Sequence, residues 1–207
     1  QATGATSDYF NNCGWVAPAL VDAGLNDFPD GEAAVGGIYT NAWKEYIGTT
    51  LLATMEAGSN YQFSFYVAGT CINNLGQSTG YNISIMPPVD ITLYGCTNGT
   101  NLPLSTYTSP PEADPTWIEI GHVSYTPQQT WQQVTINFTV PVDINAIMLG
   151  APVNLPDAYS ASQNLCYPYI SYDSLILNDA SLFDVNISQS GSFCEDNLVL
   201  VSNIENS

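Results

Sequence analysis

The sequence of 207 residues has almost no cationic side chains. It holds one lysine, Lys44, no arginine and one histidine against 19 acidic residues, so its formal net charge is −18. Proteins bind nucleic acids largely by neutralising phosphates with Lys and Arg, so the composition excludes a DNA- or RNA-binding role. The same shortage disfavours anionic membranes, sulfated polymers and uronic-acid polymers, and it leaves neutral glycans, cations and basic protein surfaces. High negative charge also keeps an exported protein soluble without any ligand.

Long apolar runs are missing too. A membrane-spanning helix needs about 20 consecutive apolar residues, and the apolar runs here are far shorter, so we expect no membrane insertion. The first residues are polar and lack the charged and apolar segments of an export signal, which we expect to have been removed or to lie upstream. The length suits one β-sandwich, or one sandwich plus part of another domain, and with 45% apolar residues the chain can bury a core.

The five cysteines show no metal-binding spacing. No CxxC pair or Cys/His cluster occurs, so a zinc site is not expected. Scattered cysteines in an acidic, exported chain favour disulfides, and because five is odd, at least one partner is missing, free or on another chain. The pairing stays open. The predicted disulfide cysteines are Cys13, Cys71, Cys96, Cys166 and Cys194.

The sequence also lacks a recognisable catalytic motif. The only histidine is His122, and no G-x-S-x-G motif supplies a nucleophile for it. Among 19 acidic residues some pair lies close by chance, and no local motif marks one as a glycosidase pair. We therefore expect a protein that is not an enzyme.

Several short segments alternate apolar and polar residues, as strands with one buried face do. They are rich in β-branched and aromatic residues and are separated by Gly, Pro, Asn and Ser. The segments are 61–67, 82–86, 90–94, 133–140, 146–150 and 169–177. The one helix-like stretch, 49–56, fits a strand equally well. The pattern predicts an all-β fold, an antiparallel jelly-roll β-sandwich.

Two long loops, about 96–116 and 152–168, interrupt the strands, and we expect them to lie near each other. Loops on a sandwich usually carry the binding site. Neutral sugars stack on Trp and Tyr and hydrogen-bond with Asn, Asp and Gln. The predicted ligand-binding residues are Trp117, Tyr107, Tyr159, Tyr167, Asp114, Asp157 and Asn164. The alternative is that such aromatics cap the core, which we expect of Trp43 and Trp131.

The composition shifts after Leu177, where residues 188–194 lead into the apolar segment 197–201. These two stretches predict the opening strands of a further domain. The chain is thus expected to divide into a jelly-roll domain, 1–180, and a linker with opening strands, 181–207.

Residues 2–13, which contain Asp8-Tyr9-Phe10-Asn11 and Cys13, resemble the T-x-DYFN-x-C signature of jelly-roll domains in large exported proteins of the Bacteroidota. The segments 36–47, 61–67, 91–95, 131–135 and 172–177 fit the same family pattern in order, with Lys44 in place of the usual arginine. The resemblance covers about residues 1–177. The family's preceding NGSFE-type strand is absent from this sequence.

The resemblance implies a carbohydrate-binding-module-like domain carried by type IX secretion to the bacterial cell surface. Residues 183–207 resemble the first two strands of an immunoglobulin-like repeat, which implies that the partner of Cys194 lies beyond Ser207. Related jelly rolls hold a structural calcium where the first and last strands meet, and Asp173 matches the acidic residue of the last strand. The alternative role for Asp173 is to satisfy a backbone turn.

These observations predict a non-catalytic, secreted or cell-surface module that recognises a neutral carbohydrate as part of a large adhesin or polysaccharide-associated protein. Its partner would be a glycan or surface polymer, and its only cofactor a structural calcium. The alternative is a structural or protein-interaction module of a surface adhesin or filament, with other chains of that assembly as partners. An exposed aromatic pair in a cleft would favour the first, and an apolar or flat polar surface the second.

Overall fold

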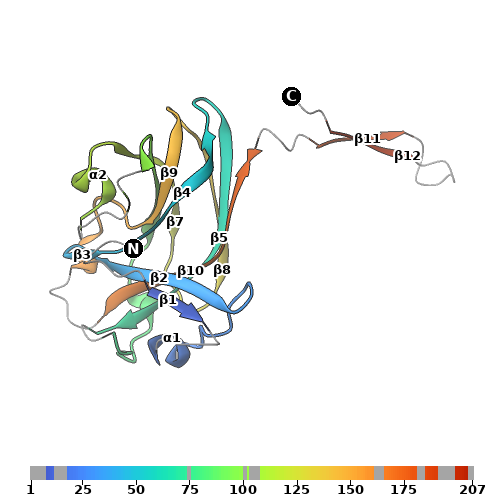
Figure 1. Cartoon of the computed structure of the whole chain (residues 1–207). Helices are drawn as coiled ribbons and strands as arrows, with labels where there is room; N and C mark the ends of the chain where they lie inside the picture. The colour runs from blue at the N-terminus through green and yellow to red at the C-terminus, as the bar shows by residue number, and fades with distance from the viewer. Residues whose placement is uncertain are drawn as a thin grey trace.

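The computed structural model describes residues 8–11, 18–73, 76–99, 102, 108–160 and 166–180, and the backbone of 185–190 and 199–204. Two antiparallel β-sheets face each other across a common core (Figure 1). The larger sheet has the strand order β1-β2-β10-β5-β8 with β3 paired to β2, and the smaller has the order β4-β9-β6-β7. The predicted all-β, antiparallel sandwich is therefore confirmed.

The larger sheet is built around two strands of 13 residues each, β10 and β5. Its strands are β1 (Asp8–Asn11), β2 (Ala33–Thr40), β3 (Trp43–Lys44), β10 (Tyr167–Asp179), β5 (Asn60–Ile72) and β8 (Gln132–Thr139). The smaller sheet consists of β4 (Tyr46–Met55), β9 (Ile144–Gly150), β6 (Val89–Cys96) and β7 (Trp117–Tyr125). The helical turns are short: α1 (Pro18–Asp22), η1 (Ile83–Ile85), α2 (Pro110–Ala113) and η3 (Asp157–Tyr159).

Alternating side chains from the two sheets form the main core. Along β5, Phe63, Phe65 and Val67 point inward and are buried, while the residues between them face outward. Phe65 also makes an edge contact with Tyr172 of β10, with ring centroids 5.7 Å apart. Removal of such apolar area from water is the main force that holds the two sheets together.

A second, smaller core lies on the outer face of the larger sheet. Leu20 and Leu25, in and after α1, pack with Phe10 of β1 and Ala68 of β5. Trp131, expected in the core, lies partly buried at the margin of this cluster, where its ring meets Phe28 edge to face. The second core covers part of the outer face of the sheet, next to the cleft described below.

Most of the predicted strand segments are strands in the structure. The exception is 82–86, where η1 forms because the Asn82 side chain accepts a hydrogen bond from Ser84 N at 2.9 Å and caps a helical turn. The ambiguous stretch 49–56 belongs to strand β4 through Met55. Among the described residues, no helix is long and apolar enough to span a membrane.

One disulfide, Cys71–Cys166, joins the end of β5 to the start of β10 and closes a separation of 95 residues. Cys96 is a buried thiol whose sulfur lies 3.4 Å from the Thr116 hydroxyl, so the prediction of a disulfide at Cys96 was wrong. Its side chain packs in the small cluster around Trp117. Cys13 and Cys194 lie outside the described residues.

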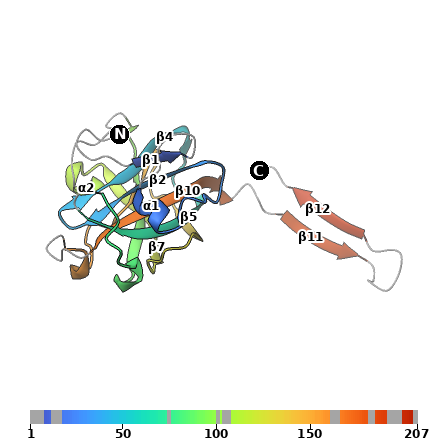
Figure 2. The same cartoon turned by 90° about the horizontal axis from the view of Figure 1, so that it is seen from below.

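Strands β11 (Val185–Ser190) and β12 (Val199–Ile204) form a two-stranded antiparallel sheet of their own (Figure 2). Strands were expected here as the opening of a further domain. The division at residue 180 and the immunoglobulin-like character of the second part stay predictions.

Loss of the disulfide should lower stability. Replacing both Cys71 and Cys166 with Ala is expected to reduce the free energy of unfolding by about 2–4 kcal/mol, because a long loop in the unfolded chain is no longer closed. Chemical denaturation measures this. Wild-type protein reduced with dithiothreitol is the control and should lose a similar amount. Equal stability of the oxidised and reduced wild type would contradict the prediction.

The protein should also unfold in alkali. Burial is the first cause of a raised pKa in seven tyrosines: Tyr39, Tyr46, Tyr94, Tyr125, Tyr159, Tyr169 and Tyr172. For Tyr125 burial raises the pKa to about 12. The unfolded chain ionises these groups near pH 10, so their contribution to stability is complete below that pH and falls as the pH rises further.

An alkaline titration followed by tyrosinate absorbance and circular dichroism checks this expectation. Most tyrosinate should appear together with the loss of the β-sheet signal. If all tyrosines ionise while the β-sheet signal persists, the folded state does not suppress tyrosine ionisation, and the expectation is wrong.

Candidate functional site

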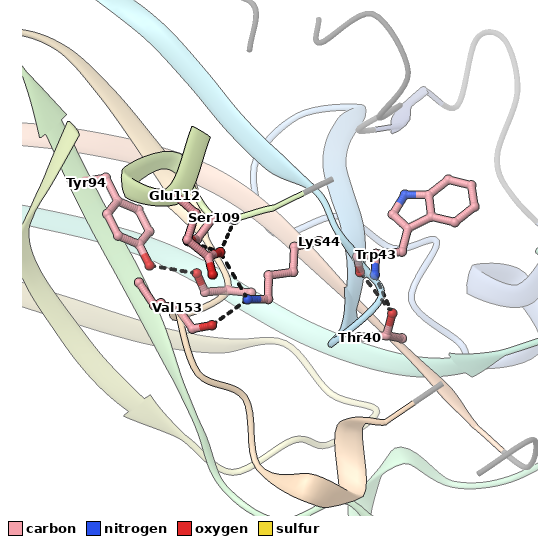
Figure 3. A network of polar contacts seen from close by, with 8 residues as sticks. Thr40, Trp43, Lys44, Tyr94, Ser109, Glu112 and Val153 are labelled. Carbon is pink, nitrogen blue, oxygen red and sulfur yellow. Dashed lines mark hydrogen bonds and ion pairs between the residues drawn. The ribbon is translucent and has the colours of Figure 1, made fainter. Parts of the chain in front are cut away.

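The short strand β3 sends consecutive side chains to opposite faces of the sheet. Trp43 pairs with Thr40 and Lys44 pairs with Tyr39, so alternation directs Trp43 outward and Lys44 toward the core. The Thr40 hydroxyl fixes this turn, since it donates to Trp43 O at 3.1 Å and accepts from Trp43 N at 3.0 Å. Figure 3 shows Trp43 and Lys44 leaving the strand in opposite directions. Trp43 is 41% exposed, which contradicts the expectation that it lies in the core.

Lys44, the only Lys or Arg of the chain, is 5% exposed. Its ammonium donates a hydrogen bond to Val153 O and lies 3.9 Å from a carboxylate oxygen of Glu112 (Figure 3). Burial lowers the pKa of Lys44, and the Glu112 charge partly offsets that effect. The folded surface therefore presents no Lys or Arg side chain.

The same contacts bring the two long loops together. Glu112 is held at the start of α2 because its carboxylate accepts from Ser109 N at 2.9 Å and from the Ser109 hydroxyl at 2.5 Å. These hydrogen bonds are the main reason that the pKa of Glu112 is lowered. Lys44 thus joins α2 in the first loop to Val153 in the second (Figure 3). The expectation that the loops lie near each other is confirmed for their described parts.

On the outward side of β3, the larger sheet is hollowed. A cavity of about 380 Å³, here called the outer-face cleft, collects residues from β1, β2, β3, β5 and β10 and from the loop after β5. Its lining consists of Asp8, Ile38, Thr40, Ala42, Trp43, Glu45, Ile72, Asn73, Gly76, Tyr167 and Tyr169.

Glu45 places a buried carboxylate at this cleft. Only 3% of the residue is exposed. One carboxylate oxygen accepts from Trp43 Nε1 at 3.1 Å, and the other accepts from Ile38 N at 2.8 Å. The bond to Nε1 fixes the indole edge, so Trp43 is held in one orientation before any ligand arrives.

Asp8 and Tyr169 form a second polar pair in the cleft. The Tyr169 hydroxyl donates to the Asp8 carboxylate at 3.0 Å. Burial raises the pKa of Asp8, and the hydrogen bond from Tyr169 partly opposes this. Burial likewise raises the pKa of Tyr169, and the nearby charges of Asp8 and Glu45 raise it further. Both carboxylates therefore act on the same phenol.

Two glycines of β2 make room for these groups. A Cβ atom at Gly36 would lie 2.5 Å from Cε1 of Tyr169, and one at Gly37 would lie 2.8 Å from Cβ of Glu45. Both distances are shorter than real contacts allow, so larger residues would displace Tyr169 and Glu45. The Gly36-Gly37 pair is thus a sequence feature tied to the cleft.

The disulfide supports the opposite wall. Cys71 immediately precedes Ile72 and Asn73, and Cys166 immediately precedes Tyr167. The covalent bond therefore fixes, relative to each other, the two chain segments that supply these lining residues.

Two of the predicted ligand-binding aromatics are buried, so those predictions were wrong. Trp117 is 1% exposed and packs with Tyr94 and Met148, while Tyr159 is 1% exposed and donates from its hydroxyl to Pro87 O at 2.8 Å. Both rings are enclosed by the sandwich, so neither offers a face to a ligand.

The other predicted residues are distributed differently. Tyr167 is half-buried and lines the outer-face cleft. Asp114 accepts from the backbone and hydroxyl of Thr116 and closes a turn, and Asp157 is exposed at the start of η3; neither lines the cleft. Tyr107 and Asn164 lie outside the described residues.

Asp173 is buried, and both of its oxygens accept backbone donors, from Asp30 N at 2.8 Å and Ser174 N at 2.7 Å. Within the described part of the chain, no cluster of three His, Cys, Asp or Glu residues suits a metal ion. The structural calcium at Asp173 stays a prediction. The lone histidine, His122, is exposed on β7, and its Nδ1 lies 2.7 Å from a carboxylate oxygen of Glu119.

Sequence reasoning missed Trp43, Glu45, Asp8 and Asn73 as cleft residues. A signal was available for Trp43, because it sits in the polar turn segment Thr40-Asn41-Ala42 and Lys44-Glu45 and not in a long apolar run. Glu45, directly after β3, belongs to the same polar segment. Asp8 and Asn73 were not accessible from spacing, because they come from β1 and from the loop after β5.

No protein-family model matches this chain, and no curated protein matches it. Among solved structures it is similar to the CBM22-2 xylan-binding domain of Paenibacillus barcinonensis Xyn10C, with 8% identity, a TM-score of 0.43, and coverage of 75% of this chain and 83% of that chain. The CBM22-1 domain of the same protein is 10% identical, with a TM-score of 0.42, and the match covers 86% of this chain and 88% of that chain. TmCBM61 in complex with β-1,4-galactotriose is 13% identical, with a TM-score of 0.33, and the match covers 74% of this chain and 75% of that chain.

Removing the Lys44 charge should destabilise the protein. Lys44→Met keeps the apolar stem but leaves Val153 O without its donor, which is expected to cost about 1–3 kcal/mol of unfolding free energy. Glu112→Gln is the comparison variant and should cost less, because the Glu112 side chain is half exposed. Denaturant unfolding of the two variants tests the ranking, and a Lys44→Met variant as stable as wild type would disprove it.

Proposed function

We propose that this chain is a non-catalytic carbohydrate-binding module and that it recognises a neutral glycan through the outer-face cleft. The observation that carries the proposal is the exposed indole of Trp43, held in place beside the half-buried Tyr167 and the carboxylates of Asp8 and Glu45. Sugar rings stack their C–H faces on such rings, and their hydroxyls donate to such oxygens.

The charge of the protein narrows the ligand class. With Lys44 buried, the cleft offers no Lys or Arg side chain to a sulfate or a uronic acid. Its carboxylates would repel such groups. A neutral glycan avoids this repulsion and can use the carboxylates as hydrogen-bond acceptors.

The proposed setting is the outside of the cell, as a module of a larger cell-surface adhesin or polysaccharide-associated protein. The disulfide Cys71–Cys166 supports this setting, because such bonds persist in oxidising compartments. A structural calcium near Asp173 remains part of the proposal. Its removal by a chelator is expected to lower the melting temperature.

Binding to neutral oligosaccharides tests the function. Wild-type protein should bind at least one member of a neutral glycan array saturably and without releasing shorter sugars. Trp43→Ala should weaken that binding at least about tenfold, because a sugar–aromatic stack is lost. Calorimetric titration with the best glycan measures the loss.

Tyr81→Ala is the matched control, since Tyr81 is an exposed aromatic that does not line the cleft. It should bind like wild type. The proposal fails if no neutral glycan binds, or if Trp43→Ala binds as tightly as wild type.

A second candidate function, a protein-interaction module, draws on a different surface. At one side of the sandwich, an apolar cavity of about 310 Å³ lies between β4 and the last part of β10, lined by residues such as Leu51, Phe63 and Leu177. Leu175 lines the same cavity and is 39% exposed. Exposed apolar surface of this kind favours protein contacts. Leu175→Ser would weaken such a contact and leave glycan binding unchanged.

A further inference from the structure

The outer-face cleft concentrates negative charge beside an aromatic ring. Asp8 and Glu45 both act on the Tyr169 hydroxyl, and Glu45 is almost fully buried. A phenol O–H, an indole N–H and a backbone N–H, each of them neutral, donate to these two carboxylates. These hydrogen bonds orient the carboxylates without cancelling their charge.

The chain supplies very little positive charge elsewhere. Its single Lys points to the opposite face of β3, where it donates to Val153 O, and it has no Arg. A ligand cation entering the cleft would therefore meet two carboxylates without competing with a Lys or Arg side chain of the lining. Each charge-assisted hydrogen bond in such a site is stronger than a neutral one.

Trp43 adds a second attraction for a cation. Its Nε1–H is directed at Glu45, and 41% of the residue remains exposed. The face of an indole attracts an ammonium group, most strongly where water is partly excluded. An aromatic face and carboxylates in one cleft are thus complementary to a group that is both flat and positively charged.

We propose that the outer-face cleft prefers a glycan whose sugar units carry a free, protonated amino group over a neutral glycan of the same shape. This inference rests on the proposed carbohydrate-binding function and specifies its ligand. On an amino sugar the ammonium is attached directly to the ring, so one residue can stack on Trp43 and place its charge near Glu45 and Asp8. A lysine side chain carries its ammonium on a flexible stem and offers no comparable flat face.

Three β-1,4-linked tetrasaccharides that differ only in the C2 substituent provide the test: cellotetraose with a hydroxyl, chitotetraose with an acetamide and its fully de-N-acetylated form with an ammonium. Titration calorimetry in slightly acidic buffer, where the amine is protonated, should give about tenfold tighter binding for the ammonium form than for either neutral form. The preference should shrink as salt is added, because salt screens charge.

Variants locate the effect. Asp8→Asn keeps an oxygen to accept from Tyr169 but removes a charge, and it should reduce the ratio of the amine to the hydroxyl affinity to about threefold. Glu45→Gln should reduce the ratio similarly, with thermal unfolding used to confirm that it folds. Asp157→Asn is the matched control: it removes an equal charge from an exposed site outside the cleft and should leave the ratio unchanged.

The outcomes separate the two proposals. Equal affinity for the three tetrasaccharides, or a ratio that Asp8→Asn and Asp157→Asn change alike, would overturn the amine preference and leave the glycan-binding function intact. Binding of none of them, together with a negative neutral array, would overturn the glycan-binding function itself. Tetralysine binding as tightly as the amine tetrasaccharide would assign the cleft to basic peptides and overturn the inference.

Discussion

The position of Lys44 is the constraint on which the rest of this architecture depends. Its ammonium reaches Val153 O and the Glu112 carboxylate, so the turn after β2, helix α2 and the second long loop are joined on the inner side. Because consecutive side chains of a strand point to opposite faces, Trp43 must then lie on the outer face. One buried cation thus joins the two loops to β3, and the same strand directs outward Trp43, the most exposed tryptophan among the residues that the structure describes. It also removes the only Lys from a surface that is otherwise acidic.

The sandwich could be predicted because its information is local. The segment 133–140 alternates strictly, and 61–67 alternates through Phe65 before it turns fully apolar. Residues 61–67 and 133–139 lie in strands with one buried face. The segment 82–86 alternates equally well, yet it forms a helical turn because a side-chain cap on Asn82 competes with strand pairing. The apolar–polar periodicity of the sequence does not show whether a side-chain cap will compete with strand pairing.

The site was less accessible from the sequence, for a related reason. Tyr167 was identified because it lies in or beside a long loop. The same reasoning failed for Trp117, which begins β7, and for Tyr159 of η3, because both side chains are buried. The cleft instead gathers residues from five strands, and Asp8 and Tyr169 are 161 positions apart. Such a juxtaposition follows from strand order. The composition nevertheless anticipated the character of the cleft, because a chain with one Lys and no Arg has little with which to make a basic site.

The burial of Lys44 also limits how this protein can be degraded. A protease that cuts after Lys or Arg has a single target bond in 207 residues, and in the folded molecule that bond follows a buried side chain held between a strand and two loops. Cleavage there requires opening of the β3 region, so the rate would follow the free energy of that opening. Digestion by enzymes of the trypsin type therefore reports how often this corner of the fold comes apart.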